Sequence, residues 1–171
     1  YCNNTGIQNN GKNIFLFDGS STVYNSDGSL MVTAKPYNEE ILEINLFDEK
    51  NVLDEENSEE KDTRELYNGL IYGLKKFFEQ TGIKKAVIGV SGGIDSAVSA
   101  SLATTILGKE NVIGINMPSK FNSDLTKKVA EKLCQNLGIN YKVILIQESV
   151  DRTIDQLESS GFLINKIGKE N

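Results

Sequence analysis

A chain of 171 residues with 39% hydrophobic and 25% charged residues has the composition of a globular protein with one or two domains. It contains no apolar run near the roughly 20 residues that a membrane span needs. It also contains no histidine, which excludes histidine-based catalysis and histidine-ligated zinc within these residues. Two cysteines, Cys2 and Cys134, favour a reducing compartment such as the cytoplasm. Because the chain has neither a basic patch nor a long apolar run, we expect no nucleic-acid partner and no membrane partner.

Residues 1–47 have the pattern of short strands. We predict strands at 14–17, 23–24, 30–34 and 40–47, with a hairpin turn at Asn25-Ser26-Asp27-Gly28 between the second and the third. Such strands need a helix layer or a second sheet over one face to be stable. We therefore expect 1–47 to be the last piece of a larger N-terminal domain.

An acidic segment separates this β-rich part from the rest of the chain. Eight acidic residues and two lysines lie between 48 and 62, so this segment alone accounts for the net charge of −6. A run of like charges that carries no apolar periodicity is usually solvated. We interpret 48–62 as a linker.

From residue 63 onward, helical and strand patterns alternate. The pattern predicts helices at 63–80, 94–107, 123–137 and 148–157, and strands at 86–90, 112–116 and 141–146. Strands that alternate with helices in this way favour a doubly wound α/β domain, in which helices cover both faces of a parallel sheet. The fold class we predict is therefore α/β.

The run Val87-Ile88-Gly89-Val90-Ser91-Gly92-Gly93-Ile94-Asp95-Ser96 carries the clearest functional signal. It reads as a strand, a glycine turn and a helix N-terminus, which is a geometry that presents backbone N–H groups to a phosphate. The two serines add hydroxyl donors, and Asp95 places a carboxylate where a phosphate-bound Mg²⁺ would lie. No Gly-Lys-Ser/Thr follows the glycines, so the loop is not a Walker A motif.

The segment Ser91-Gly92-Gly93-Ile94-Asp95-Ser96 resembles the SGGxDS loop of the ATP pyrophosphatases, also called PP-loop enzymes. This group includes NAD, GMP and asparagine synthetases and tRNA-modifying enzymes, which cleave ATP between the α- and β-phosphates and adenylylate an oxygen of their substrate. The competing interpretation is a glycine-rich βα turn in an ordinary doubly wound domain. In that case Asp95 and Ser96 would serve only to stabilise the first helical turn.

Three further segments are similar to the glutamine-dependent NAD synthetases. Residues 63–75 resemble the helix before the loop, and Asn116-Met117-Pro118-Ser119-Lys120-Phe121-Asn122-Ser123 resembles the family's MPSxYSS segment. Residues 13–21, with Gly28 and the closing Ile44-Asn45-Leu46, resemble the final strands of a nitrilase-like glutaminase domain. GMP and asparagine synthetases carry unrelated glutaminase domains, so this last segment discriminates between them.

The resemblance implies a division of the chain into three parts. They are the terminal strands of a nitrilase-like α/β sandwich at 1–47, a linker at 48–62, and at 63–171 an NAD synthetase domain of the adenine nucleotide alpha-hydrolase-like type, incomplete at its C-terminus. The family's Cys–Glu–Lys set lies upstream of the matched region and its QAR segment beyond residue 171. No catalytic residue is therefore assigned here, and Cys2 is interpreted as a strand cysteine rather than a nucleophile.

The chain also departs from the family pattern. Phe121 replaces the tyrosine and Asn122 a serine of the MPSxYSS segment, and Lys128 or Val129 stands where the following helix carries an acidic residue.

The implied activity is the ATP-dependent amidation of deamido-NAD to NAD through an adenylylated nicotinate carboxylate, with ammonia supplied from glutamine. The resemblance implies a homo-oligomer and an isolated fragment that is inactive, with Asp95 holding Mg²⁺. It also implies ATP contacts at Gly89, Val90, Ser91, Gly92, Gly93, Ile94, Asp95 and Ser96, and a weaker one at Met117. The alternatives are another PP-loop activity, of the GMP synthetase or tRNA thiolase type, or a non-catalytic nucleotide-binding module.

Overall fold

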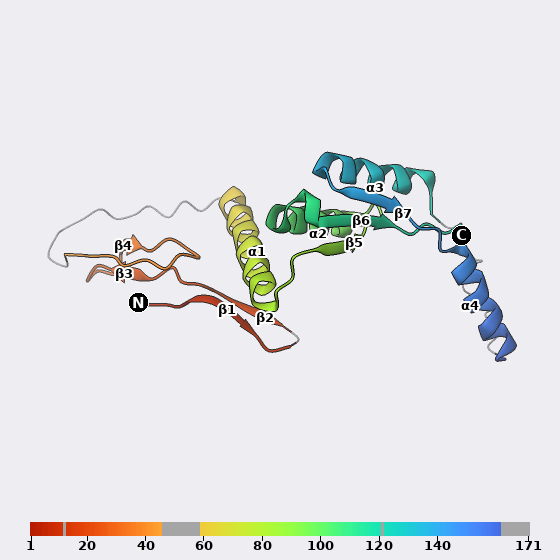
Figure 1. Cartoon of the computed structure of the whole chain (residues 1–171). Helices are drawn as coiled ribbons and strands as arrows, with labels where there is room; N and C mark the ends of the chain where they lie inside the picture. The colour runs from red at the N-terminus through yellow and green to blue at the C-terminus, as the bar shows by residue number, and fades with distance from the viewer. Residues whose placement is uncertain (12, 46–58, 121, 162–171) are drawn as a thin grey trace. The chain divides into compact units, whose positions relative to one another are not determined.

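The structure is a computed structural model that describes residues 1–11, 13–45, 59–120 and 122–161. It divides into two compact units, Tyr1–Ile83 and Lys84–Asn171 (Figure 1). Each unit has its own secondary structure and its own contacts.

The first unit contains two antiparallel strand pairs. Strand β1 (Thr5–Asn9) pairs with β2 (Ile14–Asp18), and β3 (Thr22–Tyr24) pairs with β4 (Leu30–Thr33). The β3–β4 hairpin closes through the predicted turn, where the N–H of Gly28 donates to the carbonyl of Asn25 at 3.0 Å. The strands expected near 14–17, 23–24 and 30–34 are confirmed, whereas β1 was not predicted.

The strand predicted over 40–47 is wrong for residues 40–45, which form no regular element. Ile41 is 93% exposed, so no neighbouring strand covers its side chain. The backbone N–H of Lys35 instead donates to the Glu40 carboxylate at 2.9 Å, which holds this stretch as a loop. Residues 46 and 47 lie outside the described residues, as does most of the predicted linker, 48–58.

Helix α1 (Glu59–Thr81) completes the first unit and begins at Glu59 rather than at 63. It packs on β1 and β2 within that unit. Two glycines one turn apart, Gly69 and Gly73, face Leu16 of β2, and a Cβ at Gly69 would lie only 2.8 Å from the Tyr37 hydroxyl. The rings of Tyr37 and Tyr72 lie 4.9 Å apart. These contacts do not test the domain boundary at 63, which stays a prediction.

The second unit is a parallel α/β sheet. Strands β5 (Ala86–Gly89), β6 (Val112–Asn116) and β7 (Asn140–Val143) lie side by side in the order β5-β6-β7. Helix α2 (Ile94–Leu107) and a short 3₁₀ helix, η1 (Lys109–Asn111), connect β5 to β6. Helix α3 (Asp124–Leu137) connects β6 to β7, and α4 (Gln147–Ser159) follows. The predicted alternation of helices and strands is confirmed.

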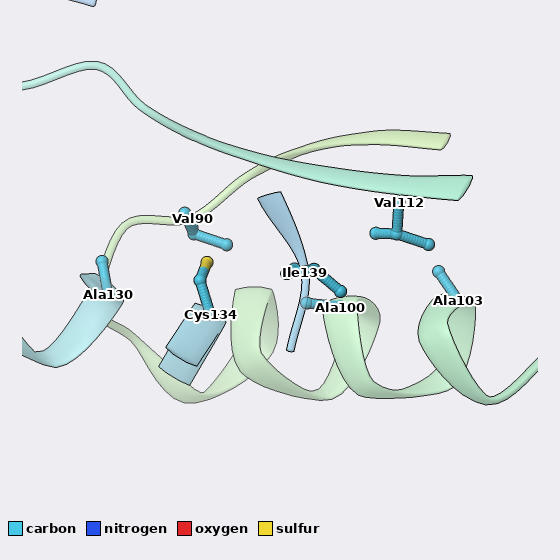
Figure 2. Packing of buried hydrophobic residues seen from close by; sticks show 7 residues of the cluster. All are labelled: Val90, Ala100, Ala103, Val112, Ala130, Cys134 and Ile139. Atoms are coloured by element: carbon cyan, nitrogen blue, oxygen red, sulfur yellow. The ribbon is translucent and has the colours of Figure 1, made fainter. Parts of the chain in front are cut away.

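The core of this unit is built from small side chains. Seven buried residues form one cluster between the strands and helices α2 and α3 (Figure 2): Val90, Ala100, Ala103, Val112, Ala130, Cys134 and Ile139. Both crossovers run in the same direction across the sheet, and right-handed crossovers then place both helices on one face. On the opposite face Val87 is 65% exposed. The second helix layer of a doubly wound sheet therefore stays a prediction.

Candidate functional site

The glycine-rich loop lies at the C-terminal end of β5 and leads directly into α2. The side chain of Val90 is 1% exposed, and its N–H donates to the carbonyl of Ile115 on β6 at 2.8 Å. The next residues leave the sheet, and α2 begins at Ile94. The strand, turn and helix expected from the sequence are thus confirmed. Ligands of open α/β sheets bind at this carboxyl edge.

Gly92 fixes the path of this loop. Its φ of +88° is a backbone conformation that residues with a side chain rarely adopt. A Cβ at this position would also overlap the backbone of α3, with the carbonyl carbon of Thr126 at 3.1 Å and its oxygen closer still. The loop therefore packs directly on the first turn of α3, and only glycine satisfies both conditions.

The two serines of the motif fold the loop onto itself. The N–H of Ser91 donates to Ser96 Oγ at 3.3 Å, and the N–H of Gly93 donates to Ser91 Oγ at 3.3 Å. Ser96 Oγ in turn donates to the carbonyl of Gly93 at 3.0 Å. Both hydroxyls thus lie beside the backbone N–H groups that would face an anion.

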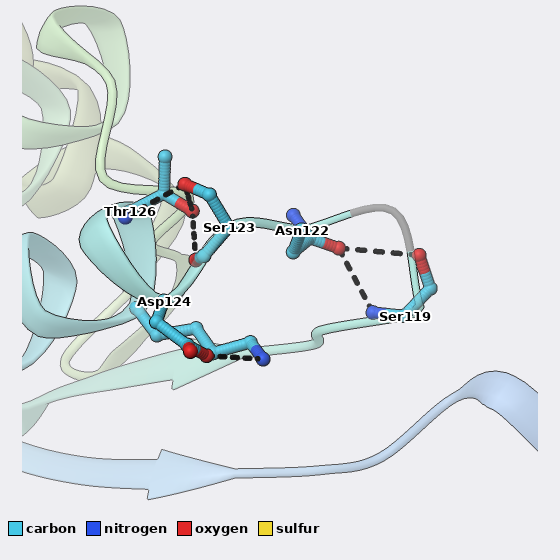
Figure 3. Close-up of polar contacts among 6 residues, drawn as sticks. Ser119, Asn122, Ser123, Asp124 and Thr126 are labelled. Carbon is cyan, nitrogen blue, oxygen red and sulfur yellow. Dashed lines mark hydrogen bonds and ion pairs between the residues drawn. The ribbon is translucent and has the colours of Figure 1, made fainter.

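The two helices that begin at this edge differ in how they are capped. Ser123 caps α3, since its Oγ accepts the N–H of Thr126 at 3.3 Å (Figure 3). The N-cap of α2 is Gly93, which has no side chain and makes no side-chain cap. The first-turn N–H groups of α2 are therefore available to an external acceptor, and the helix dipole favours an anion there.

Met117 lies next to the glycine-rich loop. It follows β6, the strand beside β5, and its Cε lies 3.7 Å from the position of a Cβ on Gly89. Met117 as a whole residue is 50% exposed. The residues that precede the loop and the end of β6 therefore meet, as the predicted site requires.

The segment after Met117 is held by side chains that sequence reasoning missed. The amide oxygen of Asn122 accepts hydrogen bonds from the N–H and the hydroxyl of Ser119, at 2.8 and 3.2 Å (Figure 3). The N–H of Lys120 donates to the side chain of Gln147 at 2.8 Å. Asn122, a departure from the family pattern, thus closes a turn of its own. No sequence signal pointed to Gln147 or to the backbone of Thr126.

A buried polar residue ends β6. Asn116 is only 5% exposed. Burial raises the pKa of the half-buried Tyr141 hydroxyl on β7, and the Asn116 side chain offsets part of that rise. A polar side chain is thus buried at the end of β6, just before Met117.

Asp95 is an exposed carboxylate in the first turn of α2. Within the described parts of the chain, no three cysteine, aspartate or glutamate side chains gather into a group able to hold a metal ion. A single carboxylate nevertheless suits Mg²⁺, which is commonly held by one or two carboxylates together with substrate phosphates. The site thus fits Mg²⁺ only together with a phosphate ligand. None of the helices in the described residues combines the length and apolar character of a membrane span.

Comparison with known proteins places this geometry in a family. The NAD synthase family profile matches residues 66–171. The chain belongs to the NAD synthase family. A glutamine-dependent NAD(+) synthetase from Aquifex aeolicus is 35% identical over 173 residues, covering 81% of this chain and 30% of that protein. An NH(3)-dependent NAD(+) synthetase from Pyrococcus horikoshii is 47% identical over 94 residues, covering 54% of this chain and 35% of that protein.

Solved structures support the same fold. The glutamine-dependent NAD+ synthetase from Acinetobacter baumannii, in complex with ADP, matches 97% of this chain and 31% of its own, with a TM-score of 0.77 and 23% identity. The NMN synthetase from Francisella tularensis matches 56% of this chain and 40% of its own, with a TM-score of 0.52 and 31% identity. The chain thus spans about a third of the curated relatives it matches, from 26% to 33% of the first glutamine-dependent ones.

Proposed function

We propose that the protein containing this chain converts deamido-NAD to NAD in an ATP-dependent amidation, and that this chain supplies the pyrophosphate side of the ATP site. The observation that carries the proposal is the N-terminus of α2, which has no side-chain cap. This helix end follows the turn at Gly92, at the carboxyl edge of the sheet. Membership of the NAD synthase family supports the reaction class. A fragment that spans about a third of its relatives is proposed to be inactive alone.

The loop residues grip phosphate oxygens mainly through the backbone. The first-turn N–H groups of α2 are donors without a side-chain cap, and the positive end of the helix adds about 0.3–1 kcal/mol for an anion at an exposed terminus. In this structure the hydroxyl oxygens of Ser91 and Ser96 accept hydrogen bonds from two backbone N–H groups of the loop. On binding they rotate toward the phosphate and release those N–H groups as further donors.

The chemistry that this grip serves is adenylylation of the nicotinate carboxylate. A carboxylate oxygen attacks the α-phosphorus of ATP, the bond to the bridging oxygen of the β-phosphate breaks, and pyrophosphate leaves with the electron pair. Ammonia then attacks the activated carbonyl carbon, AMP leaves with the electron pair of the broken carbon–oxygen bond, and the attached nitrogen loses one proton to become the amide NH₂. The protein mainly positions groups and offsets the charge on the leaving pyrophosphate.

Asp95 is the residue we assign to Mg²⁺. When bound, Mg²⁺ neutralises the charge that develops on the leaving phosphates. The carboxylate of Asp95 lies in the first turn of α2, beside the N–H groups that face the same phosphates. We also assign the exposed side chain of Met117, beside Gly89, to the adenine of ATP.

We propose glutamine as the ammonia source, delivered from a nitrilase-like domain that ends in residues 1–47. The glutamine-dependent relatives match 77% to 92% of this chain, whereas the NH(3)-dependent ones match 52% to 60%. The longer matches therefore include much of the first unit. Two unpaired cysteines, Cys2 and Cys134, agree with a cytoplasmic location. We also propose a homo-oligomer, which rests on the resemblance to the family alone.

The test replaces Asp95 in the full natural polypeptide that contains this chain. Asp95→Asn is expected to lower NAD and pyrophosphate formation from ATP and deamido-NAD by about 10²-fold or more, the typical loss when one charge-stabilising group is removed. Glutamine hydrolysis should remain measurable. Glu148→Gln, which also changes an acidic residue in the first turn of a helix, is the control and should retain activity.

Near-normal NAD formation by the Asp95→Asn protein would contradict the assignment of Mg²⁺ and of the loop. Wild-type protein should be assayed in parallel for the competing products. Formation of NMN, as made by the Francisella relative, or of GMP from XMP in place of NAD would redirect the substrate assignment.

A further inference from the structure

One side chain of α4 holds the segment that follows β6. The backbone N–H of Lys120 donates to Gln147 Oε1 at 2.8 Å, across 27 residues of sequence. Gln147 is the first residue of α4. The bond therefore ties the exit of one strand to the helix that follows the next strand.

The Gln147 amide is fixed in one orientation. Its Nε2 donates to Asp151 Oδ1 at 2.7 Å, one turn further along α4. Asp151 also lies 3.8 Å from the Lys120 ammonium. A flipped amide would point its NH₂ at the Lys120 N–H and its oxygen at the carboxylate, so both bonds would be lost. Asp151 thus aims the acceptor of Gln147 at the Lys120 backbone.

This bond bears on the loop at 91–96 through Met117. Segment 117–120 starts with the residue whose side chain touches the position of a Gly89 Cβ, at the end of β5. The hydrogen bonds between Ser119 and Asn122 close a turn within the segment, but they do not attach it to the rest of the unit. The attachment to α4 is made at Lys120.

Hydrogen bonds are the main contacts that attach segment 117–120 to α4. All of α4 is described, and none of its residues is buried: Val150 and Ile154 are half-buried and Leu157 is exposed. Apolar burial therefore contributes less to holding α4 in place than it does for a core helix. The surface ion pair between Lys120 and Asp151 contributes little as well, because exposed pairs are weak. The hydrogen bonds of the Gln147 amide are the stronger directional link.

We propose that Gln147 is a positioning residue for the nucleotide site: it fixes segment 117–120, and so Met117, beside the loop at 91–96 without touching the nucleotide. This inference rests on the proposed function, because it assigns a role within the same ATP site. Asp151 serves by orienting the Gln147 amide.

The test uses the full natural polypeptide with Gln147→Ala, and Glu148→Gln as the control. Losing one hydrogen bond of this kind typically weakens an interaction roughly three- to tenfold. We expect a rise of that size in the Kd for ADP and in the KM for ATP, with kcat little changed. Hydrogen exchange at the Lys120 amide should quicken, while the control matches wild type in all three measurements.

A double variant that exchanges the amide and the carboxylate of residues 147 and 151, with no change in net charge, distinguishes a positioning role from a general loss of structure. Gln147→Glu alone keeps an acceptor for Lys120 but faces the Asp151 carboxylate, so like charges repel and the KM for ATP should rise. Adding Asp151→Asn replaces that carboxylate with an amide. The amide NH₂ at position 151 then donates to the carboxylate at position 147, so the hydrogen bond within α4 runs in the opposite direction. The double variant should recover the wild-type KM and slow Lys120 exchange.

The possible results are distinguishable. A Gln147→Ala protein with faster Lys120 exchange but an unchanged KM for ATP and Kd for ADP overturns the positioning role and leaves the proposed function standing. Unchanged Lys120 exchange overturns the bond itself. Wild-type protein that binds no ADP and releases no pyrophosphate overturns the proposed function.

Discussion

Gly92 and Thr126 lie in direct backbone contact, although they belong to different connections of the sheet. The first lies in the loop after β5 and the second in the first turn of α3. This contact sets how closely the phosphate-binding loop approaches the neighbouring helix. It also makes the two adjacent glycines of the motif unequal.

Gly92→Ala is expected to destabilise the protein, and Gly93→Ala is not. At Gly92 the alanine would adopt a φ of +88°, which costs about 1–2 kcal/mol, and would also overlap the Thr126 backbone, where overpacking adds roughly 1–3 kcal/mol. Gly93 has a φ of −90°, and a Cβ added there would lie 3.4 Å from Ser91 Oγ, an ordinary contact. Urea unfolding of the two variants measures the difference. Equal stabilities would refute the contact.

Gly114→Ala should be destabilising and should be rescued by a second substitution. A Cβ on Gly114 would lie 2.6 Å from Cys134 Sγ, while its next neighbours lie at 3.5 Å. Overpacking of this kind costs about 1–3 kcal/mol. Cys134→Ala removes the sulfur and makes room, so the double variant should be more stable than Gly114→Ala alone. Thermal unfolding of the two single variants and the double variant gives the three stability changes of a double-mutant cycle. Strictly additive changes would contradict the contact between positions 114 and 134.

Cys134 should make stability fall at alkaline pH. Burial raises the pKa of its thiol above the ordinary value, so the native state keeps a proton that the unfolded chain loses. The stabilising contribution is complete below the unfolded pKa, about 8.5, and is lost as pH rises toward the folded value. The slope is at most about 1.4 kcal/mol per pH unit. Urea unfolding between pH 7 and 10 should show this decline in wild type and less of it in Cys134→Ala.

The same burial predicts selective labelling. Cys2 is exposed and Cys134 is buried, so a thiol reagent should modify one cysteine in the native protein and both in denaturant. Mass spectrometry of the labelled peptides identifies which. Rapid native labelling at Cys134 would contradict the core in Figure 2, where its sulfur points toward Val90.

Two glycines within α1 should respond differently to alanine. Replacing a glycine in a helix interior gains about 1 kcal/mol of helix propensity. At Gly73 the added methyl would meet Leu16 at 3.6 Å, an ordinary contact, so Gly73→Ala should stabilise the protein. At Gly69 it would lie 2.8 Å from the Tyr37 hydroxyl and 3.2 Å from Leu16, so that gain is offset. Calorimetry of the two variants is the measurement; a larger stabilisation at Gly69 would contradict the packing of α1.

The errors of sequence reasoning have a common cause. Strand β1 was missed because its sequence, Thr-Gly-Ile-Gln-Asn, contains a single large apolar residue; its register with β2 makes it a strand. The stretch 40–45 has apolar residues but pairs with no strand of the described residues, and it forms a loop. Strand formation depends on a neighbouring strand, which is often distant in sequence, so a local pattern alone predicts it poorly.

The sequence by itself determined the elements of the second unit and the loop at 91–96, because helical periodicity, glycine conformation and capping depend on residues a few positions apart. It also indicated the family through the motif at Ser91 to Ser96. Only the tertiary structure decided that Gly92 rests on Thr126, that Met117 lies over Gly89 and that Gln147 holds Lys120. Those pairs are brought together by the register of parallel strands and the crossovers between them, which no short stretch of sequence encodes.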